Sequence, residues 1–293
     1  MKFLMLTAYF PPEIGSASHL FFELGQKLVE KGHEVRVITG FPRYNVNVKR
    51  LPQKYRAPLY LKEKIGELEV IRLKTLSLPR AVPLLRGIDQ FVTSFIFLIG
   101  GIFLRGNLFD LILVYSPPLP LGLTAFLLGK LKRRPFILNV QDLFPQSVID
   151  LGLLRNRFLI RIFESLEWWI YRKASLVTVH SEGNRRHVLS KGIAQNKVRV
   201  VPNWVDTEAV RPGERCNGFR TKFGFRDEFI ISFAGVIGRA QDLDTVIDCA
   251  YYLRGRPSLS DKNRSITSFI SFSTFSSSGF LTASVISPSM KSP

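Results

Sequence analysis

An amide and a carboxylate directly follow an apolar run near the middle of the chain. Gln141 and Asp142 come after the run at residues 136–140. A carboxylate at the mouth of a sheet can orient a hydroxyl group or accept its proton. We therefore take Asp142 as the candidate catalytic residue and Gln141 as a candidate ligand contact. The residues leave open an alternative role for Asp142, as an N-cap for the turn that follows.

A second polar group lies between the first apolar run and the first helical pattern. The free N–H groups at a helix N-terminus suit an anion or ligand hydroxyls, so this loop is a candidate ligand contact. A plain N-cap role for its serines stays open. The loop lacks the GxGxxG pattern of dinucleotide folds, which argues against a nicotinamide-dependent enzyme. The candidate residues are Glu13, Gly15, Ser16 and His19.

A third candidate, Ser116, stands between a short apolar run and two prolines. Ser116 could help to shape a ligand pocket, and a rigid turn is the alternative interpretation.

The elements that must position these residues follow an alternating pattern. Apolar, β-branched runs predict strands, and helical periodicity fills the intervals between them. Strands that alternate with helices predict a doubly wound α/β domain with a parallel sheet. In such sheets ligands bind beyond the carboxyl ends of the strands, where the three candidate loops fall. The predicted strands are 2–8, 35–39, 68–73, 111–114, 136–140, 176–179 and 198–201.

The pattern also predicts the domain organisation. Residues 1–202 form the first domain, and residues 203–215, rich in turn formers, read as a linker with Asn203 as its hinge. Residues 216–253 hold a strand at 229–234 and a helix at 243–253, the incomplete start of a second α/β domain. Residues 254–293 are crowded with serine and predict an irregular tail. A truncation or reading-frame change near residue 254 is our hypothesis, and a native low-complexity tail is the alternative.

The amino-acid composition limits which binding partners and which cellular compartment the protein can have. A formal net charge of +18 calls for an anionic neighbour. The neighbour could be nucleic acid, an acidic membrane leaflet or phosphorylated substrates. Nucleic acid is the weakest of the three, because the chain has no zinc-ligand spacing, RNA-binding aromatic motif or basic helical stripe. A solvated basic surface and contact with an anionic membrane both stay open. Two cysteines give no metal site and fit a reducing cytoplasm.

One apolar stretch, Phe91 to Leu104, invites comparison with a membrane span. It is shorter than the roughly 20 residues that a span needs, and it contains two glycines. We therefore predict a buried crossover helix here.

Short motifs along residues 1 to about 253 resemble those of a known family. They are the proline, glutamate and glycine of the first loop, Gly32-His33-Glu34-Val35, the VVPNWVD stretch from Val200, and Phe233-Ala234-Gly235. Together they resemble glycosyltransferase family 4, which has the GT-B fold. The QDLFP run from Gln141 and the GRAQ run from Gly238 look most like its O-antigen and capsule branch, near the fucosamine transferases.

The resemblance implies an activity and its partners. A sugar would pass from a nucleoside diphosphate donor to a lipid-linked glycan acceptor, with retention of configuration and without a metal or other cofactor. Such an enzyme builds lipopolysaccharide or capsule in the cytoplasm, peripheral at the anionic inner leaflet of the membrane.

The resemblance also assigns roles to the candidate residues. The first domain would hold the acceptor through the candidates of the three loops. The second domain would grip the donor diphosphate with a glycine turn, a helix N-terminus and a cation. Arg239 is the only cation of that loop, and the donor-binding residues would be Gly235, Gly238, Arg239 and Gln241.

Several departures from the family pattern bear on activity. Gln141 replaces a common His, Ser16 replaces a second Gly, and Asp242 adds a charge that repels a diphosphate. The paired glutamates that grip the donor in the family are not found. We therefore predict an enzyme impaired on its own, with a non-catalytic membrane-associated binding module as the alternative.

Overall fold

The computed structural model describes residues 1–56, 58–76, 78, 83–104, 109–225, 233, 241–253, 270–276 and 279–285. The chain divides into two compact units, Met1–Trp204 and Val205–Pro293, and each is described by itself.

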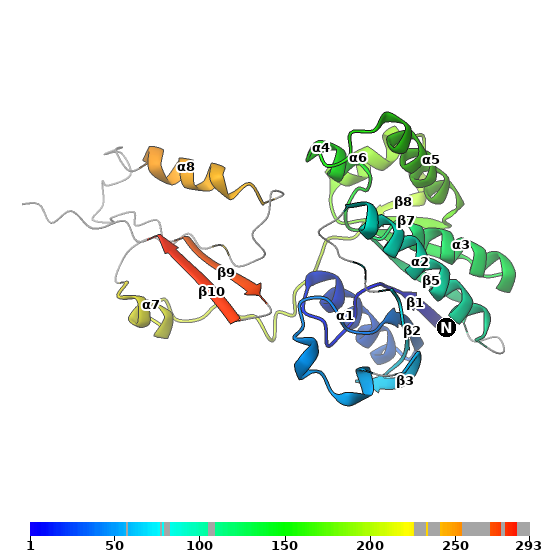
Figure 1. The fold of residues 1–293 in the computed structure, drawn as a ribbon, viewed down its shortest axis with the longest axis horizontal. Coiled ribbons are helices and arrows are strands. Elements are labelled where there is room, and N and C mark those ends of the chain that lie inside the picture. Colours follow the sequence, from blue (N-terminus) through cyan, green and yellow to red (C-terminus); the bar gives the residue numbers. More distant parts are fainter. Residues whose placement is uncertain are drawn as a thin grey trace, which may run out of the picture. The chain divides into compact units, whose positions relative to one another are not determined.

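The first unit is built on one eight-stranded sheet (Figure 1). Its order is β3-β4-β2-β1-β5-β6-β7-β8, and every neighbouring pair is parallel except β3 and β4. All seven predicted strands are present. They are β1 (Lys2–Leu6), β2 (Glu34–Gly40), β4 (Leu68–Leu73), β5 (Leu111–Ser116), β6 (Phe136–Val140), β7 (Leu176–Val179) and β8 (Val198–Val200).

The eighth strand, β3 (Tyr60–Ile65), was missed by the sequence pattern, so the sheet is mixed rather than wholly parallel. Its sequence, YLKEKI, is half charged because β3 is an edge strand that exposes one face. A tight turn at Gly66, with φ of +57°, returns the chain antiparallel into β4.

Helices cover both faces of this sheet, as predicted for a doubly wound domain. α1 (Ser16–Glu30) packs in one core with β1, β2 and β4. The opposite core takes side chains from the remaining long helices. They are α2 (Pro83–Ile102), α3 (Pro120–Lys132), α5 (Arg157–Lys173) and α6 (Glu182–Ser190).

Local signals explain where several elements begin and end. α1 stops before Gly32, whose φ of +79° suits glycine. Asn156 caps α5, since its side chain accepts bonds from the N–H groups of Phe158 and Leu159. Leu4 and Leu6 of the central strand are fully buried in one core and Met5 in the other, as expected for a strand covered on both faces. The short helix α4 (Gln146–Asp150) follows the loop after β6.

The prediction of a buried crossover helix at Phe91 to Leu104 is corrected. α2 is a crossover helix between β4 and β5, but only its inner side is buried. Among the described residues, it is the one helix long and apolar enough to cross a membrane. Of its 18 residues from Leu85 to Ile102, 28% are buried. The sequence could not show this, because its apolar residues occur all round the helix.

The described part of the second unit contains α7 (Gly218–Phe223), α8 (Leu243–Leu253), β9 (Ile270–Ser276) and β10 (Gly279–Val285). The helix predicted at 243–253 is present as α8, whereas the strand predicted at 229–234 lies outside the described residues apart from Phe233. The prediction of an irregular tail is wrong for 270–276 and 279–285, which pair as an antiparallel ladder. Within residues 270–273, ISFS, serine alternates with a larger apolar residue, which is the two-residue period of a strand.

Candidate functional site

The candidate residues of the first unit gather at one edge of the sheet. The loops after β1, β5 and β6 leave the carboxyl ends of three adjacent parallel strands. From β1 the chain proceeds to β2 on one side, and β5 lies on its other side. This reversal of direction is the point at which open α/β sheets bind ligands.

Glu13 ties two of the loops together. Its Oε1 accepts bonds from the N–H groups of Arg43 and Tyr44, both at 2.8 Å, and its Oε2 accepts one from Phe10 at 3.2 Å. The residue is 5% exposed, and burial raises the pKa of its carboxyl although these donors lower it. Both oxygens are therefore engaged, which favours a positioning role for Glu13. Its direct contact with a ligand stays a prediction.

Arg72 of β4 binds the backbone at the loops after β1 and β2. Its guanidinium is fully buried and donates to the carbonyls of Gly40, at 3.0 Å, and Pro11. It also pairs with Glu63 of β3 at 2.5 Å. A buried Arg needs such partners, so the loops after β1 and β2 are fixed to the body of the sheet.

The N-terminus of α1 carries Gly15, Ser16 and His19. Gly15 is the N-cap, no side chain caps the helix, and no acidic residue occupies its first turn. The alternative that Ser16 is the N-cap is therefore wrong. His19 lies 2.7 Å from Glu23 through its Nε2 atom, so its imidazole is held along the helix. An uncapped N-terminus of this kind suits a negatively charged group.

Ser116 and Gln141 belong to a chain of hydrogen bonds across three strand ends. The N–H of Gln141 donates to the Ser116 carbonyl at 2.8 Å, and its side-chain amide donates to Asn139 Oδ1 at 3.0 Å. Asn139 in turn donates to Thr178 of β7 at 3.0 Å. Ser116 and Gln141 are both buried, so this network fixes the edge from which Asp142 projects.

Asp142 is exposed at this edge, yet its surroundings alter its chemistry. Partial burial of the carboxyl raises its pKa, while the charges of His180 and Arg86 lower it. The phenol of Tyr115 also has a raised pKa, from burial and then from the charge of Asp142. Titratable groups with perturbed pKa values cluster at functional sites, so this corner is the best candidate for chemistry.

The sequence interpretation missed the contribution of α2. A shallow pocket beside the switch point is lined by Ala8, Tyr9, Arg43, Arg86, Asp89, Gln90, Thr93 and Pro118. Arg43 forms a bidentate pair with buried Asp89, at 2.7 and 3.1 Å. Arg86 has no ion pair within the described residues. The signal was available for Arg43, which lies in the loop after β2 and so obeys the same carboxyl-end rule.

Of the donor-side candidates, the structure describes Gln241 alone. Gly235, Gly238 and Arg239 lie outside the described residues, and Gln241 is exposed just before α8. Asn203 is exposed next to Trp204, whose indole donates to Glu23 at 2.8 Å. Within the described ranges no cluster of three metal-ligating side chains occurs.

The fold and this edge define an α/β protein whose candidate ligand-binding edge lies at the switch point of a mostly parallel sheet. A family model described as a glycosyl transferase 4-like domain matches residues 17–204. The chain belongs to this family of glycosyltransferases.

One curated relative is the putative colanic acid biosynthesis glycosyl transferase WcaI of Escherichia coli (strain K12). The identity is 27% over an alignment of 269 residues, which covers 88% of this chain and 64% of the relative. The chain thus spans less than two thirds of this relative.

Solved structures with the GT-B fold are similar over most of the chain. Anabaena Alr3699/HepE, solved with UDP and glucose, superposes with a TM-score of 0.56 at 15% identity, over 92% of this chain and 60% of its own. Sucrose-phosphate synthase of Thermosynechococcus elongatus gives a TM-score of 0.61 at 15% identity, over 86% and 59%. At this identity the likeness shows the fold.

Proposed function

We propose that this protein transfers a sugar from a nucleoside diphosphate donor to a lipid-linked glycan acceptor at the cytoplasmic face of the inner membrane. The product would be a bacterial surface polysaccharide such as O-antigen, lipopolysaccharide or capsule, in the branch near the fucosamine transferases. Retention of configuration without a metal is part of the proposal. Support comes from family membership, from the relative named for colanic acid biosynthesis, and from the similar fold solved with UDP.

The observation that carries the proposal is the environment of Asp142. Its carboxyl stands at the switch-point edge with a raised pKa, under the influence of His180 and Arg86. A carboxylate there can hold an acceptor hydroxyl in a reactive orientation and weaken its O–H bond. The uncapped N-terminus of α1 and the Arg86 guanidinium supply positive potential for anionic groups of the substrates.

The donor side of the proposal rests on the sequence. The loop at 235–241 would hold the diphosphate, with Arg239 as its cation, and Asn203 would act as the hinge. Because the chain spans 64% of the WcaI relative, the whole enzyme's activity is a proposal for this chain. Weak turnover by this chain alone also stays a prediction.

Transfer of radiolabelled sugar tests the proposal. The full chain is mixed with labelled nucleotide sugars and a bacterial membrane extract, beside WcaI as the reference. We expect label in the lipid fraction at a rate well below that of WcaI. Asp142→Asn should lower the rate by about 100-fold or more, whereas Asp150→Asn, which alters an exposed acid of α4, should not.

Three results of these experiments would each contradict one part of the proposal. Equal rates for the wild type and Asp142→Asn would remove Asp142 from the mechanism. No transfer from any nucleotide sugar, together with no calorimetric binding of UDP, would refute the transferase proposal. A rate equal to that of WcaI would refute the predicted impairment.

A non-catalytic membrane-associated module is the second candidate. The observation that favours it is the apolar outer side of α2. Lipid binding without affinity for any nucleotide sugar would select it.

A further inference from the structure

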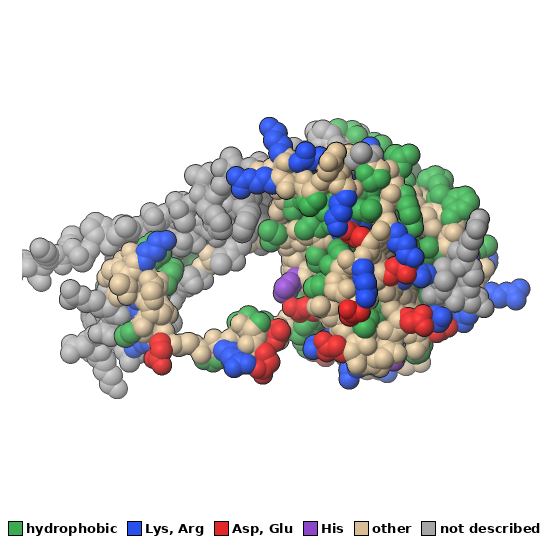
Figure 2. Space-filling view, turned by 90° about the horizontal axis from the view of Figure 1, so that it is seen from below, with side chains coloured by type: hydrophobic (Ala, Val, Ile, Leu, Met, Phe, Trp, Pro, Cys, Tyr) green, Lys and Arg blue, Asp and Glu red, His purple; other side chains and the backbone are tan. Residues whose placement is uncertain are grey.

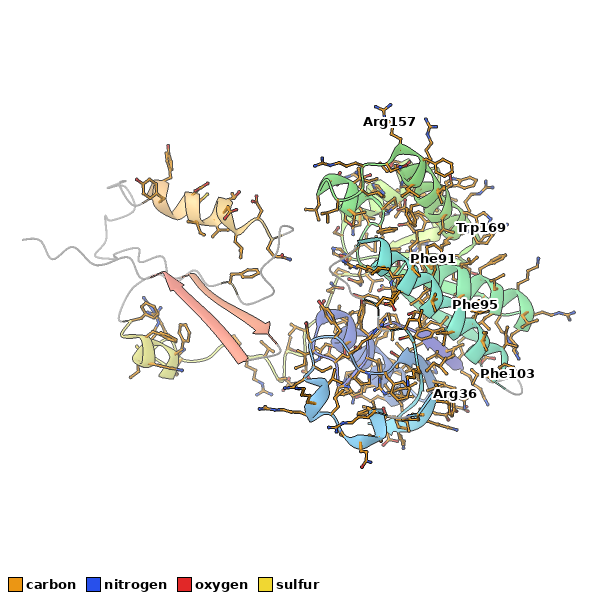
Figure 3. All side chains as sticks on the ribbon, viewed as in Figure 1. Arg36, Phe91, Phe95, Phe103, Arg157 and Trp169 are labelled. Atoms are coloured by element: carbon orange, nitrogen blue, oxygen red, sulfur yellow. The ribbon has the colours of Figure 1, made fainter. Side chains whose placement is uncertain are left out.

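The exposed side of α2 is apolar, whereas the water-facing side of a helix is ordinarily polar. Its outward positions carry large apolar side chains with helical spacing, and Phe95 and Phe103 are 61% and 78% exposed. Figure 3 shows Phe91, Phe95 and Phe103 following one another along the helix. The exposed apolar residues of α2 are Ile88, Phe91, Phe95, Ile99 and Ile102, and Phe103 follows directly.

The inner side of α2 holds the polar residues instead. Asp89, Thr93 and Ser94 are buried, and Asp89 is neutralised by Arg43. Thr124 of α3 donates to the Ser94 carbonyl at 2.7 Å. A Cβ atom on Gly101 would come within 2.5 Å of Leu128, so α2 and α3 lie in close contact. α2 is therefore fixed to the domain by its inner side, and its apolar outer side can lie on a membrane rather than span it.

The neighbouring helices extend this apolar area. Phe91 lies 6.4 Å from Phe163 of α5, measured between ring centroids, so α5 flanks the N-terminal half of α2. Phe158, which is 70% exposed, and Ile162 share a face of α5 at i, i+4 spacing. Leu131 of α3 is also exposed. Hydrophobic side chains gather visibly on the upper right of the larger unit in Figure 2.

An apolar groove continues the area beside β3. It is lined by Tyr60 and Leu73 of the sheet and by five residues of α2 and its end. Monomeric proteins rarely expose a continuous apolar area of this kind unless something covers it.

The charges of the same helices are nearly all positive. α2, α3 and α5 together contain seven cations and three acids. Of the acids, Asp89 and Glu167 are buried in ion pairs, with Arg43 and Lys191 respectively, which leaves Glu164. The cations are Arg86, Lys130, Lys132, Arg157, Arg161, Arg172 and Lys173.

Three of these cations lie at the border of the apolar area. Lys132 donates to the Leu104 carbonyl at 3.2 Å, which places it at the C-terminal end of α2. Arg157 stands at the start of α5 (Figure 3). Arg172 lies 4.7 Å from the ring of the exposed Trp168, an aromatic of the type enriched at membrane interfaces. Apolar side chains rimmed by Lys and Arg suit the headgroup region of an anionic bilayer.

We propose that the outer sides of α2 and α5 form a docking surface for an anionic lipid bilayer. The inference rests on the proposed function, because docking serves a purpose only if the substrate is lipid-linked. The N-terminal half of α2 also lines the candidate site. Docking of α2 would hold that site beside the headgroups, where a lipid-linked acceptor presents its glycan. A second copy of this chain is a poorer occupant, because a symmetric contact would bring the two rims of like charge together.

Vesicle flotation of the full chain tests the proposal. We expect the protein to float with vesicles that contain about 30% phosphatidylglycerol, and much less with neutral phosphatidylcholine vesicles. Raising the salt to about 0.5 M should weaken binding, because it screens the charges. Phe95→Glu should lower the partition coefficient by about tenfold or more. Val210→Glu is the matched control, since Val210 is 63% exposed in the second unit.

The charged rim is tested separately. Arg157→Gln and Arg161→Gln should each lower binding by about fivefold. Lys31→Gln, on an exposed residue at the end of α1, should not. Circular dichroism of each variant checks that the fold is kept.

The following results would overturn the proposal. Equal binding to neutral and anionic vesicles, or equal loss from Phe95→Glu and Val210→Glu, would contradict it. Failure to float, with a dimer in analytical ultracentrifugation that Phe95→Glu dissociates, would assign this face to a second copy. Because no sugar enters this assay, its failure is distinguishable from failure of the transferase proposal.

Discussion

At the scale of single residues, the site depends on buried polar groups that hold loops in place. Glu13 binds three backbone N–H groups, and Gln141 joins Asn139 in a network across strand ends. These residues sit among the strand ends where a ligand is expected, but they bond to the protein. Asp142 and Arg86 are the exposed charged side chains of this corner, and they are the ones available to a substrate.

Glu13→Ala should destabilise the first unit. The substitution leaves the buried N–H groups of Phe10, Arg43 and Tyr44 without their acceptor, at a cost of about 2–5 kcal/mol in the free energy of unfolding. Urea unfolding followed by tryptophan fluorescence measures it. Glu34→Ala removes an exposed acid paired with Lys2 and should change stability by less than about 0.5 kcal/mol. Similar losses for both variants would contradict the role of Glu13.

The titration of Asp142 should respond to Arg86. Because burial raises the pKa of the Asp142 carboxyl, its protonated form contributes stability below the unfolded pKa, and that contribution is lost as pH rises through the folded pKa. Arg86→Gln removes a charge that lowers this pKa, so the titration should move to higher pH. NMR of labelled aspartate carboxyls measures the shift. Lys31→Gln is the control, and an unchanged titration in Arg86→Gln would contradict the proximity.

At the scale of elements, α2 serves two surfaces at once. Its inner N-terminal half carries Arg86, Asp89 and Thr93 to the candidate pocket, and its outer side exposes phenylalanines. α3 and α5 pack beside it and share one core with it. The C-terminal end of α3 lies close against the chain that follows it, because the N–H of Arg134 donates to the Gly129 carbonyl at 2.7 Å.

Gly129 of α3 should tolerate no side chain. A Cβ atom there would lie 2.6 Å from the backbone oxygen of Arg134, which cannot swing away as a side chain can. Gly129→Ala should cost about 1–3 kcal/mol in the free energy of unfolding. Gly87→Ala in α2 is the control, because nothing lies within 4 Å of its Cβ, and it should stabilise by about 0.5–1 kcal/mol. Urea unfolding of both variants measures these free energies. A Gly129→Ala variant more stable than the wild type would contradict the close contact with the Arg134 backbone.

At the scale of the whole molecule, the chain consists of two units with different organisation. Both large hydrophobic cores lie within the first unit. The described part of the second unit has two helices and an antiparallel hairpin. The first unit therefore contains its own core, as an independently folding domain requires.

A fragment of residues 1–204 should fold by itself. It keeps both cores and the bond from Trp204 to Glu23, so its near-ultraviolet circular dichroism and unfolding midpoint should match those of the first unit in the full chain. Urea unfolding with amide hydrogen exchange makes the comparison. A fragment with native helix content but no near-ultraviolet signal would contradict this prediction.

The sequence by itself determined the seven parallel strands, the helices between them and the loops that gather at one edge. It could do so because strand and helix periods are local, and because parallel strands carry their carboxyl ends to a common edge. It missed β3, whose charged pattern is that of an edge strand, and it read the paired segments of the serine-rich tail as irregular.

Only the tertiary structure decided which polar side chains bond to the protein itself and which are exposed to a ligand. Glu13 and its partners Arg43 and Tyr44 are 30 and 31 residues apart, so no local pattern could pair them. Nor could the sequence tell which side of α2 is buried, because apolar residues occur all round it. That choice depends on the close approach of Gly101 to Leu128 and of Asp89 to Arg43, which exists only once the domain has folded.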